Sequence, residues 1–164
     1  MRFTAQAETS TVLEKWASWI ATCLGVGYFP RMPGTAGSIA GFCIFLLLRG
    51  LSPVHAGIIL ILLFAVGVYT SSLSESFFRM KDSSHIVIDE VHAMLLVSFL
   101  IPESPGWWVA GFILFRLFDI TKPPPIRRLE KLKGGWGVMM DDLAAAGYTV
   151  GLLRLSEKMV GLFA

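Results

Sequence analysis

The feature that most constrains this chain is a pair of long apolar runs that contain no charged residue. The first covers Gly37 to Leu48 and the second covers Val54 to Leu73, and only the short segment R-G-L-S-P lies close between them. A helix needs about 20 apolar residues to cross a bilayer, and a connection this short joins neighbouring antiparallel elements. The runs therefore predict a hairpin of membrane helices.

Composition agrees with a membrane environment for a single domain. The 164 residues are 54% hydrophobic and 16% charged, whereas soluble domains average roughly 25% charged residues. A net charge of +2 is too small to indicate a nucleic-acid partner. We expect one domain over residues 1–164, with residues 1–11 flexible and not a signal peptide. Cys23 and Cys43 lack metal-ligand spacing, and we expect both to be buried and unreactive.

Further apolar segments complete the expected fold. They cover residues 85–101, 107–119 and 141–161, and they alternate with polar or glycine-rich loops. Residues 12–28 place Trp16 and Trp19 at helical spacing, so this segment either lies in the membrane interface or spans the bilayer. The sequence thus predicts an all-α fold, a small helical integral membrane bundle of about five short apolar helices plus an N-terminal interfacial helix. Each helix is expected to be shorter than the roughly 20 residues of a comfortable span.

Basic residues predict how the bundle is oriented. If the five helices alternate in direction, the loops at 28–37, 74–88 and 120–140 share one side of the membrane. These loops hold most of the Lys and Arg residues, whereas the turns near 50 and 103 hold only Arg49. Because cytoplasmic loops are enriched in basic residues, the first side is predicted to be cytoplasmic. Its basic residues are Arg31, Arg79, Lys81, Lys122, Arg127, Arg128, Lys131 and Lys133.

Acidic residues gather at the same predicted depth. Asp89 and Glu90 begin one apolar segment, Asp119 ends the next, and Asp141 and Asp142 are expected to begin the last. Charge in a bilayer is costly and usually marks function, and crowded carboxylates repel one another unless a cation relieves them. Hard oxygen ligands of this kind suit Mg²⁺ or Mn²⁺. The structural alternative is that these acids pair with nearby Arg and Lys residues to fold the helix ends.

Features that favour anions accompany the acids. The segment P-G-T-A-G-S places Thr35 and Ser38 where either is expected to cap a helix, and Gly134, Gly135 and Gly137 precede the last predicted helix in a similar way. Backbone N–H groups at a helix N-terminus attract phosphate, although each segment alone is also typical of a plain turn or cap. Arg116 and Lys122 flank Asp119, so cationic and anionic groups share one helix end. This mixture suits a metal-bound phosphate ester.

Four blocks in order carry a resemblance to the phosphatidylglycerophosphatase A family. They are P-G-T-A-G-S at 33–38, I-V-I-D-E at 86–90, F-R-L-F-D-I-T-K-P-P-P-I at 115–126 and G-G-W-G-V-M-M-D-D at 134–142. The resemblance covers most of residues 24–150. Ala93 and Ala146 stand where the family pattern leads us to expect glycine, and His92 is a further departure from that pattern. Alanine still permits close helix packing.

The resemblance implies a Mg²⁺-dependent phosphatase that converts phosphatidylglycerophosphate in the membrane to phosphatidylglycerol. The expected location is the bacterial inner membrane, with the active site facing the cytoplasm. The expected metal ligands are Asp89, Glu90, Asp141 and Asp142. Asp119 is a further ligand, the acid for the departing glycerol oxygen, or the base for water. The expected substrate-binding residues are Arg31, Thr35, Ser38, Arg116, Lys122 and Arg127.

Other readings of the residues compete with this one. A small transporter or channel subunit also places carboxylates in membrane helices, but it would need polar residues at several depths. A soluble all-α protein remains open because the predicted helices are short. The match to C-x5-R at 43–49 has an apolar helical interior and is not a phosphate loop. We expect His92 to be a packing residue, His85 to lie beside the site and His55 to lie at the far turn.

Overall fold

The computed structural model describes residues 11–81 and 83–163, with side chains described as far as 159, and all of its regular elements are helices. The elements are α2 (Val12–Ala21), the 3-10 turn η1 (Val26–Tyr28), α3 (Pro33–Leu48), α4 (Pro53–Phe78), α5 (Ile88–Leu100), α6 (Pro105–Thr121), α7 (Ile126–Leu129) and α8 (Gly135–Phe163). The predicted all-α class is therefore confirmed. The segment predicted to be flexible lies outside the described residues, except Thr11, which caps α2.

Two of the helices are longer than predicted. Helix α4 has 26 residues and α8 has 29, so the expectation that every apolar helix falls short of a span is wrong for these two. Helix α4 continues through its serine-rich end because hydroxyls donate to carbonyls one turn earlier, as Ser74 does to Thr70 and Ser72 to Val68. Such internal bonds let Ser and Thr sit within a helix without solvent.

Helix α4 is long and apolar enough to cross a membrane, and α3 is a shorter apolar helix. Only 22% of the most apolar stretch of α4 is buried in the protein, which argues against a core helix of a soluble domain. Large apolar side chains also face outward on α3 and α6. These features are consistent with a small helical membrane protein.

Helix α2 is too short to be a span. Its 10 residues are half the number that a bilayer requires, so the reading of residues 12–28 as a membrane-crossing helix is wrong. Thr11 and Glu14 form a capping box that fixes its start. Its small residues Ala17 and Ala21 are buried, and α2 packs along α4, while Trp16 and Trp19 face outward.

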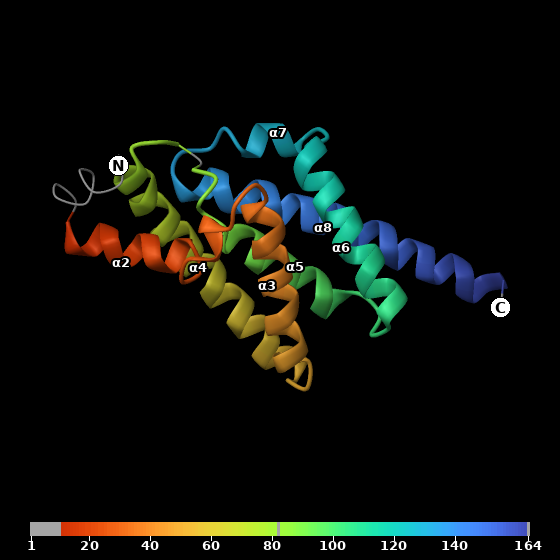
Figure 1. Cartoon of the computed structure of the whole chain (residues 1–164). Coiled ribbons are helices and arrows are strands. Elements are labelled where there is room, and N and C mark those ends of the chain that lie inside the picture. Colours follow the sequence, from red (N-terminus) through yellow and green to blue (C-terminus); the bar gives the residue numbers. More distant parts are fainter. Residues whose placement is uncertain (1–10, 82, 164) are drawn as a thin grey trace.

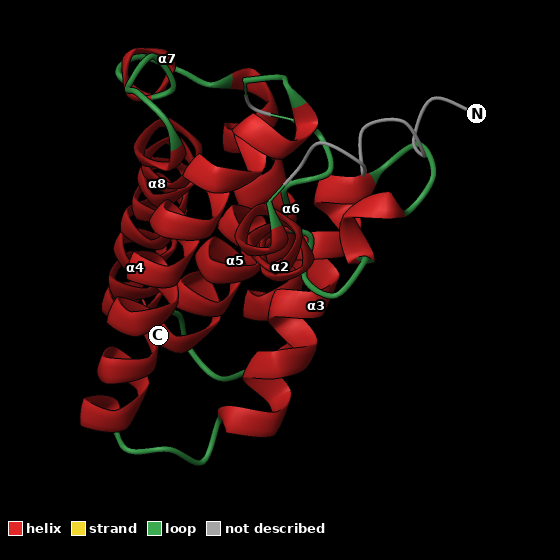
Figure 2. Cartoon of the chain, turned by 90° about the vertical axis from the view of Figure 1, so that its left-hand side faces the viewer, coloured by secondary structure: helices red, strands yellow, loops and turns green. Residues whose placement is uncertain are grey.

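Two ends of the bundle can be distinguished. Figures 1 and 2 place α7 and the N-terminal ends of α5 and α8 at one end, and the turns that join α3 to α4 and α5 to α6 toward the other. The main core lies between α5, α6 and α8, where Met94, Val97 and Phe115 are buried. Ala93 and Ala146 are fully buried in the same core. The two positions where we expected glycine are therefore packing positions.

Glycine residues set the distance between α3 and α5. A Cβ atom on Gly41 would lie 2.5 Å from the backbone oxygen of Val91, and one on Gly37 would lie 2.9 Å from Cβ of Val87. Only glycine allows so close an approach. Gly37 of the first family block therefore serves helix packing, which the reading of that block as a phosphate-binding turn did not anticipate.

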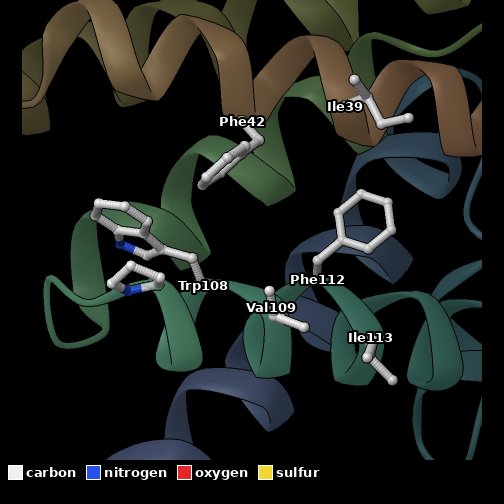
Figure 3. Close-up of a pocket in the computed structure, with 7 residues that line it drawn as sticks. Ile39, Phe42, Trp108, Val109, Phe112 and Ile113 are labelled. Atoms are coloured by element: carbon white, nitrogen blue, oxygen red, sulfur yellow. The ribbon is translucent and has the colours of Figure 1, made fainter.

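An apolar cavity of about 350 Å³ opens between α3 and α6 on the outside of α5 (Figure 3). Phe42 from α3 and Trp108 from α6 meet edge to face across it, with ring centroids 5.8 Å apart. Ile39, Val109 and Ile113 form its outer rim and are more than half exposed. The cavity is lined by Ile39, Phe42, Pro105, Trp108, Val109, Phe112 and Ile113.

Candidate active site

All five predicted acids line one cavity of about 180 Å³ at the end of the bundle that carries α7. They come from three helices, since α5 provides Asp89 and Glu90, α6 provides Asp119, and α8 provides Asp141 and Asp142. Two cationic side chains, Arg116 and Lys122, line the same cavity. The five acids, which are far apart in the sequence, therefore converge on one cavity as predicted.

The start of α5 is held in place by the segment that precedes it. The N–H of Val87 donates to the carbonyl of Ala21, and Nδ1 of His85 lies 3.1 Å from the carbonyl oxygen of Gly27. A Cβ atom on Gly27 would overlap the His85 carbonyl, so the two segments touch backbone to backbone. Asp89 and Glu90 then fall in the first turn of α5, where the helix dipole favours negative charge.

Helix α8 starts earlier than predicted, and this changes how its acids are presented. The helix begins at Gly135, so Asp141 and Asp142 lie well inside it and not at its N-terminus. The N–H of Gly135 donates to the Ser72 hydroxyl at 2.8 Å, and a Cβ atom there would overlap the carbonyl of Val68. Gly135 thus docks α8 against α4 and does not form a loop around phosphate.

Three carboxylates form the tightest group. One oxygen each from Asp89, Glu90 and Asp142 lie within 4.8 Å of one another. Asp89 and Asp142 are more than nine-tenths buried, and one buried oxygen on each of the three has no hydrogen-bond partner among the described residues. Buried carboxylate oxygens without partners are costly. The donor set and its unsatisfied oxygens fit a hard divalent cation.

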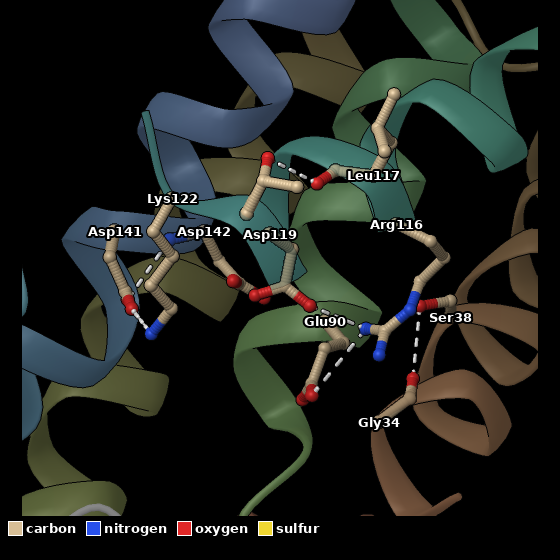
Figure 4. Close-up of polar contacts among 10 residues, drawn as sticks. Gly34, Ser38, Glu90, Arg116, Leu117, Asp119, Lys122, Asp141 and Asp142 are labelled. Atoms are coloured by element: carbon tan, nitrogen blue, oxygen red, sulfur yellow. Dashed lines mark hydrogen bonds and ion pairs between the residues drawn. The ribbon is translucent and has the colours of Figure 1, made fainter. Parts of the chain in front are cut away.

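Asp141 is engaged differently. Its Oδ2 lies 2.7 Å from Nζ of Lys122, and its Oδ1 accepts the N–H of Asp142 at 3.0 Å (Figure 4). Lys122 also lies 3.4 Å from Glu130. Lys122 ends α6 in a left-handed conformation, which is uncommon for a residue with a side chain. The expected role of Asp141 as a metal ligand stays a prediction, because the structure shows it paired with Lys122.

Arg116 lies between two acids. Its Nη1 is 2.7 Å from Oδ2 of Asp119 and 3.8 Å from Oε1 of Glu90 (Figure 4). Its Nε is buried and has no acceptor within the described part of the chain. A buried guanidinium donor without an acceptor is costly, and a phosphate oxygen is the kind of acceptor that it recognises. Arg116 is therefore placed to receive an anion.

Four predicted substrate-binding residues do not line the cavity. Arg31 and Arg127 are exposed outside it, and Thr35 lies within α3 without lining it. The expected helix cap at Thr35 or Ser38 is wrong, because α3 begins at Pro33 and the buried Ser38 hydroxyl donates to the Gly34 carbonyl. Their substrate-binding role remains a prediction without geometric support.

The structure also adds residues to the site. Gly34 lines the cavity, and a Cβ atom there would overlap Oε1 of Glu90 and lie 3.1 Å from both terminal nitrogens of Arg116. Ser83 and Ser84 line it as well, and Glu130 reaches Lys122. Only His85 separates the two serines from the I-V-I-D-E block, a signal that the sequence reasoning passed over.

The three histidines are accounted for. His92 is buried with its ring 5.5 Å from that of Phe64, as expected for a packing residue. His85 lies between the rings of Tyr28 and Phe78 next to the site without lining the cavity. His55 is at the far turn, where its Nδ1 lies 2.7 Å from the Ser52 hydroxyl.

Sequence comparisons agree with this arrangement. A model of the phosphatidylglycerophosphatase A family matches residues 19–157. A phosphatidylglycerophosphatase A of Haemophilus influenzae is 39% identical over 134 residues, 80% of this chain and 82% of that protein. The Escherichia coli phosphatidylglycerophosphatase A is 33% identical over 136 residues, 82% of this chain and 79% of that protein.

A provisionally named phosphatidylinositol-3-phosphatase of Bacteroides thetaiotaomicron is 34% identical over 151 residues, 87% of this chain and 94% of that protein. No solved structure matches the chain.

Proposed function

The chain belongs to the phosphatidylglycerophosphatase A family, and from this membership and the carboxylate cavity we propose that it removes the terminal phosphate of phosphatidylglycerophosphate. The products are phosphatidylglycerol and inorganic phosphate. One observation carries the proposal. The unpartnered oxygens of Asp89, Glu90 and Asp142 face the same small cavity as Arg116 and Lys122. A metal cation and fixed positive side chains both stabilise the charge on a phosphoryl group as it is transferred.

Mg²⁺ is the cation that we propose for this site. Asp89, Glu90 and Asp142 would hold it, with Asp141 as a further candidate next to Lys122. A bound Mg²⁺ would supply Lewis-acid neutralisation of charge on the phosphoryl oxygens. Five carboxylates against two cationic side chains leave an excess of negative charge in the cavity, which a divalent cation would offset.

Arg116 and Lys122 act on the phosphate in this proposal. The buried Nε of Arg116 donates to a phosphate oxygen, and Asp119 holds the guanidinium in place through its contact at 2.7 Å. Lys122 sits on the opposite side next to Asp141 and adds a second positive charge. The main role that we propose for Asp119 is to hold the Arg116 guanidinium in position. Its service as proton donor to the glycerol oxygen or as base for water is a further prediction.

The position of the cavity also supports a proposal for the orientation of the protein in the membrane. The cavity lies at the end of the bundle whose loops carry Arg79, Lys81 and the basic 120s segment. We propose that this end faces the cytoplasm of a bacterial inner membrane, because basic loops stay on that side and attract anionic lipid. A membrane-impermeant amine reagent should then label Lys131 in inverted vesicles and not in intact spheroplasts.

The decisive experiment measures phosphate release from phosphatidylglycerophosphate by the purified protein in detergent. We expect activity that EDTA abolishes and added Mg²⁺ restores. Asp142→Asn and Glu90→Gln should lose at least 100-fold in kcat, since each removes charge from the group that positions the reacting phosphate. Glu103→Gln, in the exposed turn at the far end, is the matched control and should keep full activity. Release that persists in EDTA, or full activity in Asp142→Asn, contradicts the proposed site.

A second headgroup is tested alongside the first. The Bacteroides relative is named for phosphatidylinositol 3-phosphate, which is also a phosphomonoester on a glycerophospholipid. The same carboxylate and Arg116 geometry would serve either substrate. The ratio of kcat/KM for the two lipids decides between them, and we expect phosphatidylglycerophosphate to be preferred.

A further inference from the structure

The active-site cavity is too small and too polar for a whole lipid. Its volume of about 180 Å³ is lined by carboxylates, Arg116 and Lys122, and it has room for a phosphate with its cation and adjoining atoms. Ligand sites that enclose a drug-sized molecule measure about 300–1,000 Å³. The acyl chains of a phospholipid substrate must therefore lie against another surface of the protein.

The apolar cavity between α3 and α6 is built on the two helices that carry Gly34 and Arg116, which line the carboxylate cavity. Gly34 and Ile39 both belong to α3 and are five residues apart, or about 7.5 Å along the helix at its usual rise. Arg116 and Ile113 both belong to α6 and are three residues apart, or about 4.5 Å. By position along both helices, the Ile39 and Ile113 end of the apolar cavity is thus the end nearest the site.

Gly34 and Arg116 form the boundary between the two cavities. A Cβ atom on Gly34 would lie 3.1 Å from the terminal nitrogens of Arg116, so the guanidinium lies directly over the backbone of α3. Along α6, the carboxylate cavity is lined by Arg116, and the lining of the apolar cavity begins one turn earlier, at Ile113 and Phe112. This order of charged cavity, guanidinium and apolar groove matches the order of phosphate, glycerol and hydrocarbon in a phospholipid.

We propose that the α3–α6 groove seats one acyl chain of the lipid whose phosphate enters the carboxylate cavity, an inference that rests on the proposed function. From Ile113 to Pro105 the groove follows α6 for eight residues, or about 12 Å, so it contacts the half of a long chain nearest the headgroup. The chain packs against Phe42, Trp108 and Phe112. Because both groove and bilayer are apolar, the gain comes from packing contacts and positioning of the phosphate, not from removal of water.

A second groove, between α6 and α8, is the competing location. It is lined by small residues, by Leu152 and Leu155, and by Phe118 and Tyr148, whose rings are in contact with centroids 5.7 Å apart. The Tyr148 hydroxyl donates to the carbonyl of Pro124, which anchors this ring pair close to the end of α6. We place the chain in the α3–α6 groove, and the α6–α8 groove is the alternative that the experiment distinguishes.

The test compares hydrolysis of a long-chain and a dihexanoyl phosphatidylglycerophosphate in mixed micelles. Ile113→Trp and Ile39→Trp fill the groove from opposite walls, and Leu62→Trp on α4 is the control at matched exposure, 60% against 58% for Ile113. Leu152→Trp fills the competing groove. We expect the long-to-short ratio of kcat/KM to fall at least about tenfold in both groove variants, since one methylene in an apolar pocket already changes discrimination by that factor. The ratio should stay at the wild-type value in Leu62→Trp.

The outcomes separate the groove from the function. Wild-type hydrolysis with an unchanged ratio in Ile113→Trp and Ile39→Trp overturns the groove and leaves the phosphatase standing. A fall in Leu152→Trp alone moves the chain to the α6–α8 groove and also overturns the proposal. No hydrolysis of either lipid by the wild type overturns both. A photoreactive acyl chain should, in addition, label residues 39–42 and 109–113 in EDTA, where no turnover occurs.

Discussion

Replacement of Gly34 by alanine isolates the contact on which the site geometry depends. The new methyl group would overlap Oε1 of Glu90 and lie 3.1 Å from both terminal nitrogens of Arg116. The backbone of α3 need not move, because both neighbours are the far ends of flexible side chains. To reach ordinary contact the Glu90 carboxylate must move by about 1 Å, and displacements of that size reduce rates roughly 100-fold. That factor corresponds to about 2.7 kcal/mol of transition-state stabilisation.

The assay pairs catalysis with stability. Phosphate release at saturating lipid should show kcat about 100-fold lower for Gly34→Ala, and more Mg²⁺ should be needed for half-maximal activity, while the melting temperature in detergent changes little. Gly41→Ala should behave in the opposite way. Its methyl group would meet the Val91 backbone oxygen at 2.5 Å, which cannot move aside, so α3 and α5 must separate and stability falls by about 1–3 kcal/mol.

Gly57→Ala is the matched control for both variants. No atom lies near enough to contact a methyl group there, so the change removes a helix glycine without a clash and should stabilise by up to about 1 kcal/mol. Wild-type kcat and Mg²⁺ response in a folded Gly34→Ala protein would refute the reasoning, because Glu90 would then not belong to the reacting geometry.

Three further predictions test other parts of the structure. Arg116→Lys should lower kcat/KM about 10- to 100-fold with no change in fold, because a hydrogen bond to a charged group is worth about 1.5–3 kcal/mol and lysine cannot reproduce the buried Nε donor; equal activity in this variant would remove Arg116 from phosphate binding. Burial raises the pKa of Cys23 to about 12, and the nearby Glu90 carboxylate is a second cause, so the thiol stays protonated below that pH. Iodoacetamide should therefore fail to alkylate Cys23 at pH 8 in a Cys43→Ser protein. Rapid labelling of Cys23, seen by mass spectrometry, would contradict its placement. Thr11→Ala removes the capping box of α2 and should cost about 1 kcal/mol of that helix's stability, seen as faster amide exchange at residues 12–15 with unchanged kcat; equal exchange would show that the cap is not formed.

Much of the fold could be predicted from local patterns. Apolar runs and the absence of charge indicated the helices, and the turns at 49–52 and 101–104 follow from Pro, Gly and Ser placed between such runs. Element ends were less predictable. The residues from Ser74 onward were expected to form a loop, yet α4 continues to Phe78, and the Ser74 hydroxyl donates to the Thr70 carbonyl one turn back. The thiol of Cys43 was expected to be buried and is exposed on α3.

The acidic members of the site were predictable for a similar reason. Carboxylates in apolar segments are rare enough to stand out, and their positions along alternating helices place them at one end of the bundle. Sequence neighbourhood was a poor guide to the remaining residues. Arg31, Thr35, Ser38 and Arg127 lie in or beside the motifs but do not line the cavity, and their substrate-binding role stays a prediction.

The sequence by itself determined that the chain is a set of apolar helices with five acids near one end, because hydrophobic periodicity and the cost of charge in an apolar medium act locally. Only the tertiary structure decided which carboxylates meet. Gly37 and Gly41 bring α3 onto α5, and Gly135 brings α8 onto α4. Carboxylate oxygens of three acids, Asp89, Glu90 and Asp142, then lie within 4.8 Å of one another, while Asp141 forms an ion pair with Lys122. The physical reason is that the relative positions of the carboxylates depend on how closely the backbones of different helices approach one another. These contacts join residues far apart in the chain, and no local sequence pattern encodes them.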